Sequence, residues 1–202
     1  MTSLMRRLCV TATGGALLAL SACVAPVGPV EVTRFHVGAT QPLTRGTIRV
    51  EPAEGQPDSI ELGTFSAAVA QELAKAGYRE PLPGQTGASQ IAQVRLDRST
   101  YRPTRNGSPV SVGVGGSTGS YGSGLGVGLG IDLSGPPPEQ VQTRLAVTII
   151  DAQTRKHIWE GRAAFAVRAD SPLAQTSLGA AKMAEALFKD FPGESGETIL
   201  VK

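Results

Sequence analysis

Two long alternating segments joined by a short polar connector constrain the fold of this chain more than any other feature. Residues 141–150 and 156–167 each show the apolar period of two that a β-strand requires. The five residues between them, 151–155, are short enough to form a hairpin connection. The sequence therefore predicts a hairpin at the centre of a sheet, with one apolar face formed by Leu145, Val147, Ile149, Trp159, Ala163, Phe165 and Val167.

Two further segments have the three- and four-residue apolar spacing of amphipathic helices. Residues 62–76 follow Asp58 and Glu61, which resemble a capping box, and precede Gly77 at the expected C′ position. Residues 171–191 begin with an N-cap serine and a proline at N1, and Pro192 ends them. The apolar stripes are Leu62, Phe65, Val69, Leu73 and Ala76 in the first helix, and Leu173, Ala180, Ala184, Leu187 and Phe191 in the second.

Shorter alternating segments at 31–37, 47–50 and 91–101 predict three more strands, the last with one wet face. The resulting order predicts a single two-layer α+β domain over residues 31–202. Its sheet is mainly antiparallel, and two main helices pack on one face. Seven aromatic residues are expected to supply much of the buried area: Phe35, Phe65, Tyr78, Trp159, Phe165, Phe188 and Phe191.

The first 22 residues read as a leader that is removed. Arg6 and Arg7 form a basic region, and residues 8–20 form an apolar segment of about 20 Å as a helix, short of a bilayer core of about 30 Å. Residues 20–23, Leu-Ser-Ala-Cys, resemble the lipobox of bacterial lipoproteins. That resemblance implies that Cys23 is lipidated and becomes the first mature residue, with residues 23–30 as a tether. An ordinary secretory leader with an incidental cysteine is the alternative.

Removal of the leader leaves 17 Lys and Arg against 17 Asp and Glu, so the mature chain has no net basic charge. This balance argues against nucleic acid as a partner. Cys9 leaves with the leader and Cys23 is consumed by lipidation, so no disulfide can form within the mature chain.

A glycine-rich insertion is expected at 110–135, as a loop or a hairpin. Its second half alternates strictly between glycine and apolar residues, which makes a candidate interaction segment of Leu125, Val127, Leu129, Ile131 and Leu133. One interpretation is a mobile loop of low complexity; the other is a flap-like hairpin that pairs with a partner strand or lies on lipid. The segment lacks the Gly-Lys-Ser/Thr ending of a phosphate loop, so nucleotide binding is not predicted.

No catalytic residue, metal site or cofactor is predicted. His36 and His157 are the two histidines, and neither has a second nitrogen or sulfur ligand at metal spacing. His157, Asp151 and a serine could be combined into a catalytic set, but no Gly-x-Ser-x-Gly segment followed by a helix supports it. His157 is expected at the surface, Trp159 in the core, and Asp97 and Asp151 at a strand edge and a turn.

Several segments together resemble the domain of unknown function 4136 lipoproteins of Gram-negative bacteria. They are residues 73–78, 93–96, 145–151, 158–163 and 191–192, with sequences LAKAGY, QVRL, LAVTIID, IWEGRA and FP. The resemblance spans most of residues 31–192 and implies an envelope lipoprotein with an α+β domain and no assigned reaction. Valine rather than aspartate at position 24 is similar to signals for transfer to the outer membrane, which the protein would enter from the periplasmic face.

The expected function is that of a non-enzymatic binding or structural module, anchored to the membrane through lipidated Cys23 and contacting an envelope protein or lipid partner. The alternative is a carrier or auxiliary component for lipid or another apolar ligand in an envelope transport system. In that alternative, the segment from Leu125 to Leu133 would act as a lid.

Overall fold

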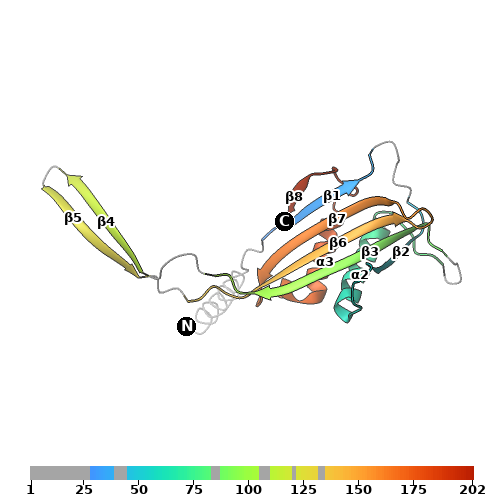
Figure 1. The fold of residues 1–202 in the computed structure, drawn as a ribbon, viewed down its shortest axis with the longest axis horizontal. Helices are drawn as coiled ribbons and strands as arrows, with labels where there is room; N and C mark the ends of the chain where they lie inside the picture. The colour runs from blue at the N-terminus through green and yellow to red at the C-terminus, as the bar shows by residue number, and fades with distance from the viewer. Residues whose placement is uncertain (1–27, 39–44, 83–86, 105–109, 120–121, 132–134) are drawn as a thin grey trace, which may run out of the picture.

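The computed structural model describes residues 28–38, 45–82, 87–104, 110–119, 122–131 and 135–202. Within them, a six-stranded sheet forms one layer and two helices form the other (Figure 1). The strands of this sheet are β1 (Val30–His36), β2 (Ile48–Pro52), β3 (Gln90–Tyr101), β6 (Gln140–Asp151), β7 (His157–Arg168) and β8 (Thr198–Val201). The helices are α2 (Ile60–Lys75) and α3 (Thr176–Phe188), with a 3₁₀ turn at Pro172–Ala174.

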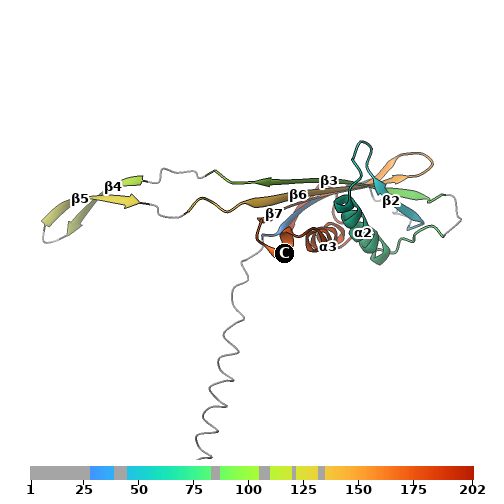
Figure 2. The same cartoon turned by 90° about the horizontal axis from the view of Figure 1, so that it is seen from below.

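The strand order is β2-β3-β6-β7-β1-β8, which places the hairpin of β6 and β7 at the centre as predicted. β2 and β3 are parallel because α2 connects them as a crossover, whereas the other neighbouring strands are antiparallel. Both helices cover the same face of the sheet (Figure 2). The predicted α+β class with a mainly antiparallel sheet is therefore confirmed.

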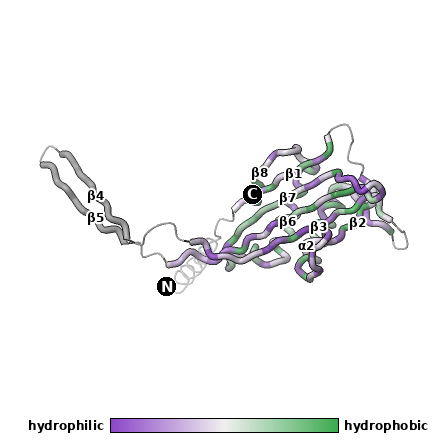
Figure 3. The backbone as a smooth tube through the Cα atoms, in the orientation of Figure 1, coloured by the Kyte–Doolittle hydropathy of each residue, from purple (hydrophilic) through white to green (hydrophobic). Residues whose placement is uncertain are grey.

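Alternation along the strands decides which residues face the helices. Hydropathy changes from residue to residue along β6 and β7 (Figure 3), and the apolar set lies in the core. Trp159 is 1% exposed, and its ring stacks on Phe188 with centroids 5.3 Å apart. At position 161, an added Cβ would overlap the indole and lie 2.8 Å from Leu187 Cδ1, so only glycine fits beside Trp159. Burial of Trp159 is confirmed.

Phe35 was expected in the core, and this prediction is wrong. The side chain is 43% exposed, because Phe35 lies on the opposite side of the β1 pleat from the buried Val32 and Arg34. Its ring lies 6.0 Å from the guanidinium of Arg162 on the neighbouring strand.

Both helix starts differ from the predicted caps. The N-cap of α2 is Ser59 rather than Asp58, since the Ser59 hydroxyl accepts a hydrogen bond from Leu62 N at 3.0 Å. Ser171 caps a 3₁₀ turn, and α3 begins only at Thr176. At the other end of α2, Gly77 has φ of +95°, as expected for C′.

Two arginines tie the helices to the sheet. Arg34, 3% exposed on β1, donates from Nε to Leu187 O at 2.9 Å and from Nη2 to Ala186 O at 3.0 Å, both in the last turn of α3. Burial lowers its pKa, and the carboxylates of Asp190 and Glu197 oppose this shift. A cation among carbonyls at a helix C-terminus is favourable, so Arg34 anchors the end of α3.

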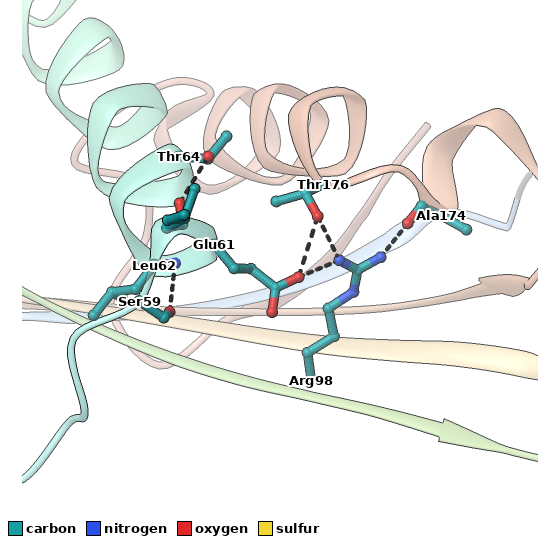
Figure 4. Close-up of polar contacts among 8 residues, drawn as sticks. Ser59, Glu61, Leu62, Thr64, Arg98, Ala174 and Thr176 are labelled. Carbon is teal, nitrogen blue, oxygen red and sulfur yellow. Dashed lines mark hydrogen bonds and ion pairs between the residues drawn. The ribbon is translucent and has the colours of Figure 1, made fainter.

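Arg98 on β3 joins the N-terminal ends of both helices (Figure 4). Its guanidinium contacts Glu61 and Ala174 O, and donates to Thr176 Oγ1 at 2.9 Å. Thr176 Oγ1 in turn donates to Glu61 Oε1 at 3.2 Å. One residue of the sheet thereby links the N-terminal ends of α2 and α3 to each other.

Strand β8 is not predicted from the sequence, in which the helix at 171–191 is the last expected element. It pairs antiparallel with β1 and forms one edge of the sheet. For the glycine-rich insertion, the sequence allows either a loop or a hairpin. In the structure, residues 110–131 contain two antiparallel strands. These are β4 (Val110–Gly119) and β5 (Gly122–Ile131), which form a separate two-stranded sheet.

Candidate functional site

The candidate binding surface is the face of the six-stranded sheet that the helices leave uncovered (Figure 2). Strand register brings residues from four strands into line there. Glu31 pairs with Ala164, Ala164 with Arg144, and Arg144 with Asp97. Residues at paired positions share a face, so this row crosses the sheet from β1 to β3. We call this surface the open face.

A shallow hollow of about 380 Å³ lies at the centre of the open face. Ala146 and Ala164 are small enough to leave space over β6 and β7, whereas longer side chains stand around them. The charged residues that line the hollow are Glu31, Arg95, Asp97, Arg144 and Arg162. A partner could therefore approach the backbone closely at the alanines and meet charges of both signs at the rim.

The charged residues at the rim form ion pairs that are largely exposed to solvent. Arg144 Nη1 lies 3.4 Å from Asp97 Oδ2, and Arg162 Nε donates to Glu160 Oε1 at 2.8 Å. Such exposed pairs contribute about 0–1 kcal/mol to stability, so a partner can replace them at small cost. The open-face cations on the four central strands β1, β3, β6 and β7 are arginines, whose planar guanidinium suits hydrogen-bonded interfaces.

Asp151 occupies the turn position expected of it, whereas Asp97 lies within β3, which is not an edge strand of the sheet. Asp97 is on β3 and pairs with Arg144, whereas Asp151 closes the hairpin of β6 and β7. Asp151 Oδ1 accepts hydrogen bonds from Thr154 N at 2.7 Å and Gln153 N at 3.0 Å. Hydrogen bonds from the Thr154 backbone and hydroxyl lower the pKa of Asp151, as expected for a turn residue.

The two histidines lie at one end of the sheet and line a second hollow of about 280 Å³ with Ser195. Ser195 Oγ bonds to the backbone of His36, accepting from its N–H at 3.1 Å and donating to its carbonyl at 3.4 Å. The His36 ring Nε2 lies 3.1 Å from Gly193 O, and His157 is exposed as predicted. The Ser195 hydroxyl and the His36 ring therefore contact backbone atoms rather than each other, as a nucleophile and its base would.

The sequence-predicted site residues fall in two groups. Cys23 and Leu133 lie outside the described residues. Leu125, Val127, Leu129 and Ile131 are in β5, away from the hollow on the open face. Among the described residues, no group of three or more His, Cys, Asp or Glu could hold a metal ion. Helices in the described ranges are all too short or too polar to cross a membrane.

The strand predicted at 91–101 has one wet face, and Arg95 and Asp97 lie on it; Arg144 and Arg162 are not predicted as site residues. The sequence prediction for β6 and β7 uses only the apolar half of their alternation. The signal that could have found them is the other half of the same period, in which Arg144, Ala146, Arg162 and Ala164 recur.

A six-stranded mixed sheet with two helices on one face and an open opposite face defines a two-layer α+β domain. The chain belongs to the family described as Domain of unknown function (DUF4136), which matches residues 46–193. An uncharacterized protein of Zymomonas mobilis subsp. mobilis is 27% identical, over 86% of this chain and 80% of that relative.

Two solved structures are similar at low sequence identity. A PDZ domain protein from Parabacteroides distasonis has a TM-score of 0.51 and 10% identity, over 86% of this chain and 39% of that chain. This chain thus spans about two fifths of that longer protein, and the likeness shows the fold alone. A PelC dodecamer from Paraburkholderia phytofirmans has a TM-score of 0.42 and 14% identity, over 78% and 96% of the two chains.

Proposed function

We propose that this protein is a lipid-anchored, non-enzymatic binding module that faces the periplasm from the outer membrane. The observation that carries the proposal is the open face, with its alanine floor and arginine-rich rim across four strands. Its partner is an envelope protein whose surface presents both signs of charge, since the rim does so too. Lipidated Cys23 would hold the domain close to the membrane.

Site-specific photo-crosslinking in intact cells tests the binding surface. A photoreactive amino acid at Ala146, in the floor of the hollow, is expected to yield one discrete adduct. The same group at Glu185, exposed on α3, is the matched control and should yield none. Equal adducts at both positions, or none at Ala146, would reject the open face as the binding surface.

The anchor has its own test. Incorporation of a labelled palmitate into the wild-type chain, lost in Cys23→Ser, is expected together with loss of outer-membrane fractionation. Wild-type protein without label would contradict the anchor. Turnover of a substrate by the purified protein, abolished by His36→Ala or Ser195→Ala, would contradict the non-enzymatic role.

A lipid or apolar-ligand carrier is the second candidate. The register of β4 and β5 favours it, because Val112 pairs with Leu129 and Val114 with Val127, which gathers apolar residues in one ribbon. Native mass spectrometry of protein extracted from membranes should then show a co-purifying lipid. A clean apo mass would argue against this candidate.

A further inference from the structure

The paired strands β4 and β5 form a ribbon with two chemically different faces. Residues at paired positions share a face, and the register pairs Val110 with Ile131 and Val112 with Leu129. On the alternate positions, Ser111 pairs with Gly130 and Gly113 with Gly128. One face of the ribbon therefore carries Val and Leu or Ile, and the other carries only Gly and Ser over this stretch.

The ribbon also lacks charged residues. No Lys, Arg, His, Asp or Glu occurs from residue 106 to residue 131, although 18% of the whole chain is charged. A two-stranded hairpin is marginally stable in water, and interior glycines weaken it further. Among the described residues, β4 and β5 pair only with each other. The ribbon thus needs an apolar surface to cover one face.

The strand register puts the ribbon at the same end of the sheet as the start of the domain. β3 ends at Tyr101, which pairs with Gln140, and Gln140 pairs with Arg168 at the end of β7. β1 runs antiparallel to β7, so it begins at this same end (Figure 1). The chain enters the six-stranded sheet and departs toward the ribbon on one side of the domain.

With the proposed anchor at Cys23, chain length would hold this side near the membrane. Seven residue steps separate Cys23 from Val30, which limits the distance to about 25 Å. Nine steps separate Tyr101 from Val110, or about 30 Å at most. Tyr101 is 43% exposed and Arg102 is exposed beside it, a pair of residue types typical of the lipid–water interface.

We propose that the β4–β5 ribbon lies flat on the bilayer, with its Val and Leu face at the acyl boundary and its Gly and Ser face toward water. The occupant of the apolar face is the lipid surface itself. This inference rests on the proposed function for the position of the anchor at Cys23. With anchor and ribbon both on lipid, the domain has two points of attachment, which fixes its orientation and leaves the opposite end of the sheet facing the periplasm.

The test compares neighbouring residues on opposite faces of β4. Val112→Cys and Ser111→Cys are each labelled with an environment-sensitive fluorophore in the lipidated full chain, then reconstituted in vesicles of phosphatidylethanolamine and phosphatidylglycerol. We expect a blue shift and several-fold stronger quenching by nitroxide lipids at position 112 than at 111. Emission typical of a buried indole from Trp159 verifies that each variant is folded.

Two results would overturn the inference. Absence of quenching at both positions would remove the ribbon from lipid, and equal quenching at both would mean that it does not lie with one face on the bilayer. A control with the unsubstituted mature chain distinguishes failure of this inference from failure of the proposed anchor. If that chain takes up the dye, Cys23 is not lipidated. In that event Val112→Cys and Ser111→Cys are each made in the Cys23→Ser background. Comparison of their quenching with added vesicles then still shows whether the ribbon lies on lipid.

Discussion

The two faces of the six-stranded sheet come from the same strands yet obey different constraints. On the covered face, neighbours are packed so closely that position 161 accepts only glycine beside Trp159. On the open face, Arg144 and Arg162 surround a hollow whose floor is alanine. Stability therefore depends on one half of each strand, while the other half is available for recognition.

The sharpest test of this contrast uses two adjacent residues of β7. Trp159→Ala should lower the free energy of unfolding by about 3–5 kcal/mol, because it removes a fully buried indole. Glu160→Ala, on the open face, should change it by less than about 0.5 kcal/mol. Urea unfolding followed by circular dichroism measures both. Equal effects would mean that the open face also carries the fold.

A second test asks whether the buried arginine belongs to the packed face. Arg34→Met should cost about 1–3 kcal/mol, since the carbonyls of Ala186 and Leu187 lose their donors at the end of α3. Phe35→Ser, one residue away on the open face, is the control. Amide hydrogen exchange should show faster exchange in the last turn of α3 for the Arg34 variant, and unchanged protection there would refute its anchoring role.

A smaller effect is expected where Arg98 joins the two helices. Arg98→Met should destabilise by about 1 kcal/mol, because Glu61 and Thr176 can turn to water once the guanidinium is gone. A double-mutant cycle with Glu61→Gln measures their coupling. Additive losses would show that the two side chains act independently.

The smallest effect concerns the hairpin turn. The pKa of Asp151 is held below its ordinary value of 3.8, so its ionised form stabilises the folded state above that pH. This contribution is lost as the pH falls below 3.8 toward the lowered pKa. Asp151→Asn keeps an acceptor oxygen but cannot titrate, so its unfolding free energy should depend less on pH in that window. An unchanged pH profile would contradict the assignment.

Much of the fold could be predicted because the apolar period of a long segment indicates whether it forms a strand or a helix. The hairpin of β6 and β7 and the stripe of α2 were correct, since each buries one face over ten or more residues. The four-residue strand β8 was missed, because its pairing with β1 depends on a partner more than 160 residues away. The hollow was missed for a related reason, because its lining residues come from four strands and become neighbours only through the pairing of those strands.

The sequence alone determined the period of each element, the pairing of residues 141–167 into a hairpin, and the position of glycine beside the single tryptophan. Those features are local, so neighbouring residues suffice to encode them. Only the tertiary structure decided that Phe35 faces outward, that Arg34 and Arg98 anchor helices, and that arginines of separate strands share one hollow. These depend on which strands become neighbours, because long-range packing rather than local periodicity sets that order.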